Sequence, residues 1–166
     1  MTFTTKKRND SFRVLILSIS VILLVMALKS CTSDDVCLSY QHNVQTGFYS
    51  ARSATHADTT LSDVVIYGIG RADSALYNVS SINKLFLNLN LNQDYTGYVI
   101  QTKSLIYTIM FLYRKELTPI SGTCGVTFSL TIDSVGYTNT FIDSVSIIYP
   151  YLQYKENAEN VEIFIY

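Results

Sequence analysis

Three cysteines are the residues of this chain whose chemistry depends most on spacing. Cys31 stands at the end of a long apolar run, and Cys37 and Cys124 follow it. A cysteine that ends an apolar leader is a potential site of lipid attachment, whereas two cysteines in an exported domain are potential disulfide partners. The chemistry of Cys31 therefore depends on the residues in front of it, and the chemistry of Cys37 and Cys124 depends on the domain behind it.

The apolar run Val14–Leu28 has the features of an export signal. Such a signal begins with basic residues and continues with an apolar region of about 7–15 residues, and here the first thirteen positions hold four Lys or Arg residues. A transmembrane helix needs about 20 apolar residues, whereas this run is shorter and contains Ser18 and Ser20. A permanent membrane span is the alternative, and the sequence favours a removable leader over residues 1–30.

The four residues that end at Cys31 resemble the bacterial lipobox, in which a leucine and two small residues precede the cysteine. Leu28, Ser30 and Cys31 match this motif, and Lys29 departs from it because its side chain is long. The resemblance implies a diacylglyceryl thioether on Cys31, cleavage in front of it and acylation of the new amine. Several acyl chains on one residue anchor a protein stably in a membrane. The alternative is an ordinary thiol beside a plain signal-peptidase site.

The part behind the leader is acidic and rich in tyrosine. Five of the twelve Lys and Arg residues but only one of the thirteen acids precede Cys31, which leaves seven basic and twelve acidic residues and a net charge of −5. This balance argues against nucleic acid as a partner, because nucleic-acid binding needs a basic surface. All 13 Tyr lie behind the leader, and Tyr, Thr, Val and Ile favour strands. We expect a lipidated tether over residues 31–36 and one all-β domain over residues 37–166.

Cys37 and Cys124 are possible disulfide partners once Cys31 carries lipid. Exported proteins pass through oxidising compartments in which such a pair closes. A bridge between them would tie the start of the domain to a late strand and stabilise it by a few kcal/mol. The alternatives are metal ligation by the two sulfurs, which lack a nearby histidine, and two buried free thiols. We expect neither a metal nor a cofactor.

Alternation of apolar and polar residues predicts eight or nine strands behind the tether. The predicted strands cover residues 44–52, 61–69, 82–92, 95–102, 105–113, 126–132, 141–149 and 161–166. The clearest alternation places Leu85, Leu87, Leu89 and Leu91 on one buried face. Leu105–Tyr113 is apolar on both faces, which predicts a central strand covered on both sides. Short strands joined by short loops favour a β-sandwich of immunoglobulin-like or related topology, and a closed barrel is the alternative.

Two segments between these strands carry further expectations. Thr118–Gly125 contains Pro119 and two glycines, which predicts an irregular segment after a strand that ends at Arg114–Glu116. The tetrad Ile-Asp-Ser-Val occurs at 132–135 and again at 142–145, on either side of a turn. Their positions favour two arms of one hairpin.

Exposed tyrosines are the remaining indication of a site, because the domain shows no pattern typical of catalysis. Its two histidines lack partners at the spacing of a zinc site or a triad, and its aspartates lack the spacing of a calcium loop. Tyr67 and Tyr77, together with Tyr95 and Tyr98, lie near strand ends and can stack on sugars or anchor a partner. The alternative is that they fill the edge of the core and keep their hydroxyls in water.

Several short motifs resemble those of a small, uncharacterised lipoprotein family of Bacteroidota that carries a domain of unknown function. The similarity covers about residues 31–150 and rests on Asp35–Leu38, Val65–Gly70, Asp73–Asn78, Arg114–Glu116 and Thr123–Gly125. It implies an envelope lipoprotein in which Cys37 is paired with Cys124, and it implies no activity and no ligand.

We therefore expect a cell-envelope lipoprotein, anchored in the outer membrane through Cys31, that is a non-enzymatic binding or structural module. Its expected partner is an envelope protein or a glycan, with Tyr67 and Tyr77 as candidate binding residues. A hydrolase that uses two carboxylates is one alternative, because their separation in space cannot be read from this sequence. A glycan-binding accessory protein is another.

Overall fold

The computed structural model describes residues 18–20, 42–121, 125–152 and 158–166. The chain divides into two compact units, residues 1–37 and residues 38–166. The described residues of the first unit, 18–20, are helical. Within the described part of the chain, no helix is long and apolar enough to cross a membrane. The predicted lipid site at Cys31 and the predicted disulfide between Cys37 and Cys124 lie outside the described residues.

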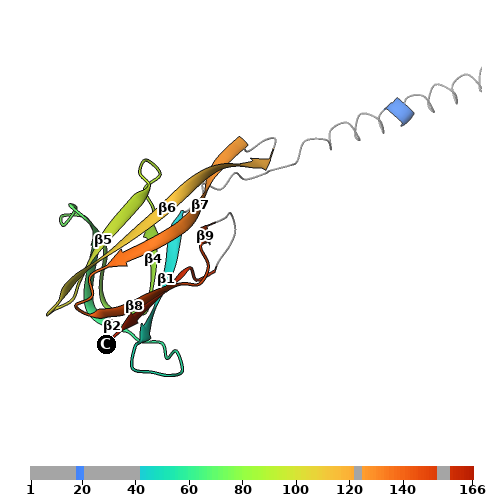
Figure 1. The fold of residues 1–166 in the computed structure, drawn as a ribbon. Coiled ribbons are helices and arrows are strands. Elements are labelled where there is room, and N and C mark those ends of the chain that lie inside the picture. The colour runs from blue at the N-terminus through green and yellow to red at the C-terminus, as the bar shows by residue number, and fades with distance from the viewer. Residues whose placement is uncertain (1–17, 21–41, 122–124, 153–157) are drawn as a thin grey trace, which may run out of the picture. The chain divides into compact units, whose positions relative to one another are not determined.

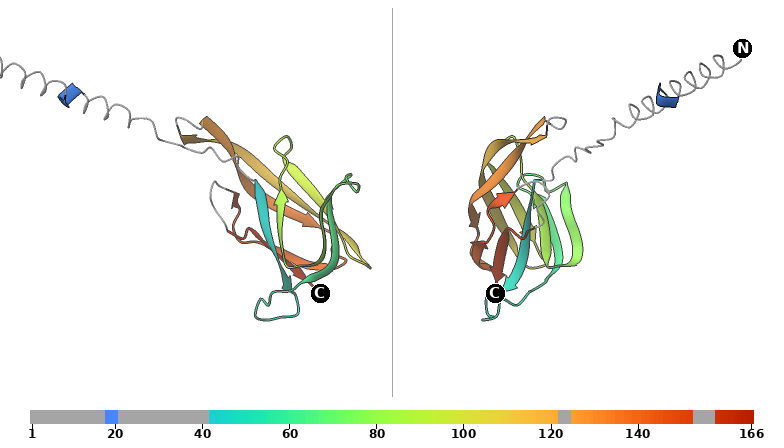
Figure 2. Two further views of the ribbon diagram at one scale, coloured as in Figure 1. Left: turned by 180° about the vertical axis from the view of Figure 1, so that it is seen from behind. Right: turned by 90° about the vertical axis from the view of Figure 1, so that its right-hand side faces the viewer.

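The second unit is a β-sandwich, as the sequence predicts (Figures 1 and 2). One sheet has the strand order β4–β1–β10–β8, and the other has the order β3–β2–β5–β6–β7–β9. The four-stranded sheet consists of β1 (Asn43–Ser50), β4 (Lys84–Asn88), β8 (Ile142–Ile147) and β10 (Val161–Ile165). The six-stranded sheet consists of β2 (Leu61–Gly68), β3 (Ala75–Ile82), β5 (Tyr95–Gln101), β6 (Ile106–Ser121), β7 (Gly125–Tyr137) and β9 (Tyr151–Leu152). β1 and β10 are parallel, and the other pairings are antiparallel.

Apolar side chains from both sheets meet in one core between the layers. Leu85 and Leu87 of β4 are completely buried, which confirms the face predicted from their alternation. They belong to the same cluster as Ile109 and Phe111 of β6, which are also completely buried. Burial of a side chain of this size stabilises the fold by about 1.5–3 kcal/mol. The two layers are therefore held together chiefly by these alternating apolar positions.

β6 is longer than the sequence predicts. It does not end at Arg114–Glu116 but continues to Ser121, and it pairs with β7 over almost this whole length. The prediction of an irregular segment over Thr118–Gly125 was therefore wrong for residues 118–121 and for Gly125. The ladder tolerates Pro119 because the register shifts between Pro119 and Ser121, where a missing N–H is least costly.

The outer face of β6 is exposed, so the predicted cover on both sides was wrong. Ile106 is 63% exposed and Leu112 is 42% exposed, whereas Tyr107 on the opposite face is buried. β6 has a neighbouring strand on each side, β5 and β7, and the four-stranded sheet covers only its inner face. Apolar residues on both faces of a strand therefore did not indicate a third layer here.

The repeated tetrads do not form a hairpin. Residues 132–135 lie in β7 of the six-stranded sheet, whereas residues 142–145 lie in β8, which pairs with β10 in the other sheet. The chain thus changes layers between the two copies, and Ile132 and Ile142 reach the shared core from opposite sheets. β3 was not predicted as a strand, since its edge position leaves most of its side chains exposed and its sequence without clear alternation. The single strand predicted over 82–92 is divided between β3 and β4.

Candidate binding groove

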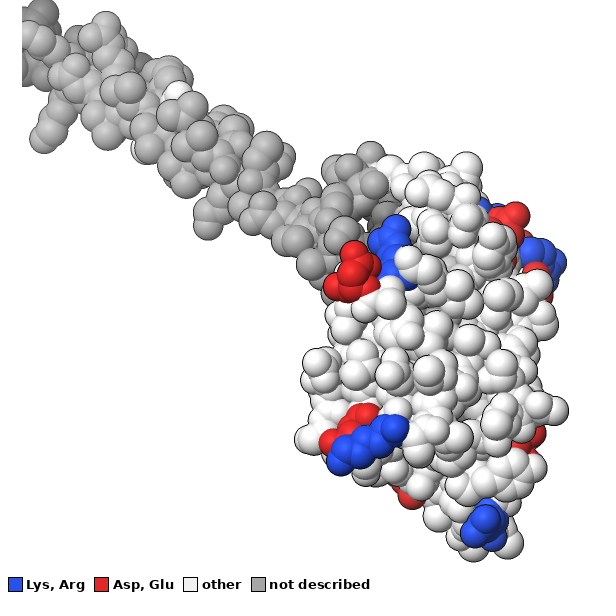
Figure 3. All heavy atoms as spheres, turned by 90° about the vertical axis from the view of Figure 1, so that its left-hand side faces the viewer, with Lys and Arg blue, Asp and Glu red and all other residues white. Residues whose placement is uncertain are grey.

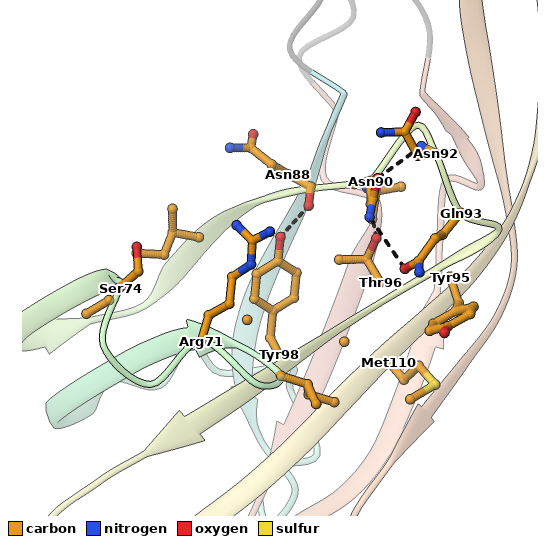
Figure 4. Close-up of a pocket in the computed structure, with 16 residues that line it drawn as sticks. Arg71, Ser74, Asn88, Asn90, Asn92, Gln93, Tyr95, Thr96, Tyr98 and Met110 are labelled. Atoms are coloured by element: carbon orange, nitrogen blue, oxygen red, sulfur yellow. Dashed lines mark hydrogen bonds between the residues drawn. The ribbon is translucent and has the colours of Figure 1, made fainter.

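A groove of about 810 Å³ lies between the β2–β3 turn and the β4–β5 loop. Figure 4 shows Arg71 and Ser74 on one side of it, Asn92 and Gln93 on the other, and Tyr98 between them. This volume is in the range of sites that hold small organic ligands. We call it the groove.

The β2–β3 turn places Arg71 at the groove. Gly70 has a φ of 79°, a left-handed conformation that costs other residues about 1–2 kcal/mol. The N–H of Arg71 donates to the Gly68 carbonyl at 2.9 Å, and the N–H of Ser74 donates to the Arg71 carbonyl at 3.0 Å. These bonds use the backbone of the turn and leave the Arg71 side chain directed away from it (Figure 4).

Tyrosine hydroxyls of the six-stranded sheet cap the outer edge of β4. The Tyr77 hydroxyl accepts a hydrogen bond from the Phe86 N–H at 3.0 Å and donates to the Phe86 carbonyl at 3.2 Å. The Tyr98 hydroxyl donates to the Asn88 carbonyl. An edge strand normally presents unpaired N–H and C=O groups to other chains. Here the hydroxyls occupy such groups and also connect the two sheets.

The same arrangement continues into the β4–β5 loop. The Asn90 N–H donates to Thr96 Oγ1 at 2.8 Å, and the Tyr113 hydroxyl donates to the Asn90 carbonyl at 2.8 Å. Thr96 Oγ1 lies 2.7 Å from the Tyr113 hydroxyl oxygen, to which it is free to donate its own proton. We call Tyr77, Tyr98, Thr96 and Tyr113 the hydroxyl row. It takes the place of a fifth strand beside β4 and the start of the loop.

Lys115 fixes the second half of the β4–β5 loop, from Leu91 to Asp94. Its Nζ donates to the carbonyls of Leu91 and Gln93, both at 3.1 Å, and lies 2.9 Å from an Asp94 carboxylate oxygen. The Lys115 side chain is only 20% exposed, so these bonds are partly shielded from water. Charge-assisted hydrogen bonds of this kind are about twice as strong as neutral ones. The loop backbone is therefore fixed before any ligand arrives.

The fixed loop leaves polar side chains free to contact a ligand. The side chains of Asn88 and Asn92 and the Arg71 guanidinium make no hydrogen bond or ion pair within the described part of the chain. The Tyr95 ring, which also lines the groove, is 49% exposed. The described groove lining contains no Asp, Glu, His or Cys. Such a surface is suited to hold a ligand through hydrogen bonds and ring contacts rather than to transfer protons.

The predicted binding tyrosines lie at different places. Tyr67 and Tyr77 do not line the groove, and the Tyr77 hydroxyl is used by the Phe86 backbone. Tyr95 and Tyr98 do line it. Burial raises the pKa of Tyr98 to about 12, because the ionised phenol would lose its hydration.

Sequence reasoning missed Arg71, Asn88 and Asn92, which resemble ordinary turn and loop residues. Asn88, Asn90 and Asn92 alternate with leucines in the sequence, and this spacing was the available signal. Alternation of this kind predicts only the solvated face of a strand. Their position at a groove depends on the β2–β3 turn opposite them, which no local pattern indicates.

The two histidines have structural contacts. His42 Nε2 lies 2.8 Å from the Phe128 carbonyl oxygen. The His56 ring meets the Phe164 ring edge-on, with centroids 5.3 Å apart, and its Nδ1 is 3.7 Å from a Glu162 carboxylate oxygen. Among the residues that the structure describes, no group of three or more His, Cys, Asp or Glu side chains could hold a metal ion.

Two of the three acidic side chains at a second hollow, of about 510 Å³ beside β6 and β7, are paired with cations. The single N–H of Arg114 Nε is shared between the two carboxylate oxygens of Asp133, at 2.9 and 3.0 Å, and Asp94 is paired with Lys115. The face drawn in Figure 3 is mostly uncharged, and its Lys, Arg, Asp and Glu side chains gather in small mixed groups. That face therefore presents no broad field of one sign that would steer a charged macromolecule.

Comparison with known proteins identifies a family but no activity. A family model described as "Family of unknown function (DUF6452)" matches residues 63–165, a range that begins in β2 and ends with β10. No curated protein and no solved structure matches the chain.

Proposed function

Because this chain belongs to the family of unknown function DUF6452, which assigns no activity, we propose its function from its own geometry. The protein is a non-enzymatic binding module that uses the groove, and a lipid on Cys31 tethers it to the cell envelope. Its ligand is an envelope glycan or a segment of an envelope protein. The observation that carries this proposal is the fixed β4–β5 loop.

A loop that is ordered without its ligand loses little conformational freedom when the ligand binds. The hydroxyl row and Lys115 together use backbone groups of Asn88, Asn90, Leu91 and Gln93. A surface loop can form its backbone hydrogen bonds with water, but here side chains of the protein form them and fix the loop. Support of this kind behind exposed polar side chains is typical of binding sites.

The leader supports the location. Basic residues, the apolar run Val14–Leu28 and the lipobox-like end at Cys31 follow one another in the order of a lipoprotein signal. We infer that the lipid on Cys31 is inserted in the outer membrane and that residues 31–36 tether the β-sandwich to it. Blocking lipoprotein signal peptidase with a globomycin-type inhibitor should leave a longer precursor, as should Cys31→Ala. If the protein has the same size with and without each treatment, the proposed lipid anchor is wrong.

Binding through the groove is tested with the full-length protein in detergent on arrays of glycans and peptides. Tyr95→Ala removes the exposed ring of the groove, and Tyr151→Ala is a matched control, because both rings are 49% exposed and Tyr151 lies outside the groove. We expect a ligand whose signal falls at least tenfold with Tyr95→Ala and is unchanged with Tyr151→Ala. Signals that the two variants reduce equally, or an array without signal, would contradict a groove-based binding function.

A further inference from the structure

We propose that the groove binds an acidic oligosaccharide and that the carboxylate of one sugar ring pairs with Arg71. This inference rests on the proposed binding function and adds the class of ligand to it. It depends on three observations: the charge of the groove, the chemistry of its remaining polar groups, and the occupied edge of β4.

The charge of the groove comes from one residue. Arg71 is the only charged side chain among the described residues that line it, and no carboxylate there neutralises it. A guanidinium presents its N–H groups as a planar fork that fits a carboxylate with two parallel hydrogen bonds. An unpaired guanidinium beside neutral side chains therefore favours a ligand that brings one negative group.

The other groups of the groove suit sugar rings. The side chains of Asn88 and Asn92 each offer a donor and an acceptor, which matches neighbouring hydroxyls that both donate and accept. Tyr95 supplies an exposed ring, and Ile69, which is 50% exposed, supplies an apolar surface elsewhere in the groove. An amphipathic ring with one apolar face and a polar rim can use both kinds of contact at once.

The missing side chain of Gly97 makes room for Ile69 on the floor of the groove. A Cβ at this position would lie 2.5 Å from Ile69 Cδ1 and 3.6 Å from Met110 Cε. Ile69 therefore occupies the space that a side chain at position 97 would take, and the groove presents Ile69 instead. The half-exposed Ile69 offers a sugar ring an apolar contact.

The edge of β4 argues against an extended peptide. Peptides that add a strand to a sheet bind through unpaired backbone N–H and C=O groups. Along this wall, the hydroxyl row already occupies both groups of Phe86 and Asn90 and the carbonyl of Asn88. The wall is left with side chains as its recognition groups, so we infer a glycan rather than a peptide.

The test measures affinity of the full-length protein in detergent for carboxylated oligosaccharides: oligogalacturonate, hyaluronate and alginate oligomers. Methyl esters of the same oligomers keep the rings and remove the charge. Arg71→Gln removes the cation of the groove, and Arg52→Gln removes an exposed cation outside it. We expect at least one acid to bind, and both its methyl ester and Arg71→Gln to weaken binding about tenfold to a hundredfold. Arg52→Gln should change the affinity less than twofold.

Three results would overturn this inference. The first is an absence of binding by every acid, and the second is equal binding of an acid and its ester. The third is equal binding of a hexaglutamate peptide, which is acidic but has no sugar ring. The proposed binding function still holds after any of these results if Tyr95→Ala weakens the binding of another array ligand. Failure of the acidic-oligosaccharide proposal can therefore be distinguished from failure of the binding function.

Discussion

The hydroxyl of Tyr113 donates a 2.8 Å hydrogen bond to the carbonyl of Asn90, which lies twenty-three positions earlier in the chain. Tyr113 lies in β6, at the centre of the six-stranded sheet. Asn90 lies two positions after the end of β4, which belongs to the other sheet. This bond therefore joins the two layers at the groove. It makes the position of the β4–β5 loop depend on the packing of the whole sandwich.

Tyr113→Phe should destabilise the fold and loosen the loop. The variant keeps the buried ring but leaves the Asn90 carbonyl without its donor, which costs about 1–2 kcal/mol for a partly buried group. Urea unfolding of the purified protein in detergent measures the change in the free energy of unfolding. Amides of residues 89–94 should also exchange with solvent faster than in the wild type.

Tyr107→Phe is the matched control for this substitution. The Tyr107 ring is buried in the same strand, and its hydroxyl is buried without a hydrogen-bond partner among the described residues. Removing a buried, unpartnered hydroxyl should leave stability unchanged or increase it by about 1 kcal/mol. A loss of stability in Tyr107→Phe equal to that in Tyr113→Phe would show that any Tyr→Phe change in β6 is harmful, and the role given to the Asn90 bond would then be wrong.

Alkaline pH should destabilise the protein partly through Tyr98. Burial raises its pKa from 10.0 to about 12 in the folded state. Between these values the unfolded chain releases the Tyr98 proton and the folded chain keeps it, so stability falls as the pH rises from 10 to 12. The contribution of Tyr98 over this interval is at most about 2 kcal/mol.

Tyr98→Phe should therefore reduce the dependence of unfolding free energy on pH between 10 and 12. Comparison of urea midpoints at pH 8, 10 and 11 in wild type and variant measures it. At pH 8 the variant should be less stable than the wild type, because the Asn88 carbonyl loses its partner. An unchanged slope above pH 10 would contradict a buried, neutral Tyr98.

Lys115→Met should release the far end of the β4–β5 loop while it keeps most of the aliphatic packing. The carbonyls of Leu91 and Gln93 lose their charged donor, so we expect a loss of about 1–3 kcal/mol and weaker ligand binding. Urea unfolding measures the loss of stability, and the array signal measures the loss of ligand binding.

Arg114→Met is the control for Lys115→Met. Arg114 lies next to Lys115 but points to Asp133, and its side chain is 68% exposed. Exposed ion pairs contribute about 0–1 kcal/mol, so this variant should retain both stability and ligand binding. Equal effects of the two variants would show that charge in β6, rather than the loop contact, is what matters.

Cys37 and Cys124 should form a disulfide in the exported protein. Both cysteines lie behind the proposed export signal, and the compartment that receives exported proteins is oxidising, so such a pair closes there. Denatured, unreduced protein should contain no thiol that reacts with a maleimide, and reduction should expose two. Two reactive thiols before reduction would contradict the bridge.

The local pattern predicted those elements whose two faces differ. Leu85 and Leu87 alternate with exposed neighbours, so one buried face was evident from the sequence. The same reasoning failed for β3, whose edge position leaves it little to bury, and for β6, whose apolar outer residues indicated a cover that does not exist. A side chain's type indicates what it can bury, but the neighbouring layer decides whether it is buried.

The groove shows the same division between local pattern and tertiary structure. By itself, the sequence determined an all-β domain and buried faces such as that of Leu85 and Leu87, and it indicated a lipobox-like end at Cys31, because these patterns lie within a few neighbouring residues. Only the tertiary structure decided that β7 and β8 lie in different sheets and that Tyr77, Tyr98 and Tyr113 hydrogen-bond to backbone groups in and just after β4. The partners in these contacts are far apart in the chain, and a strand's own residues specify its faces but not which strand lies beside it.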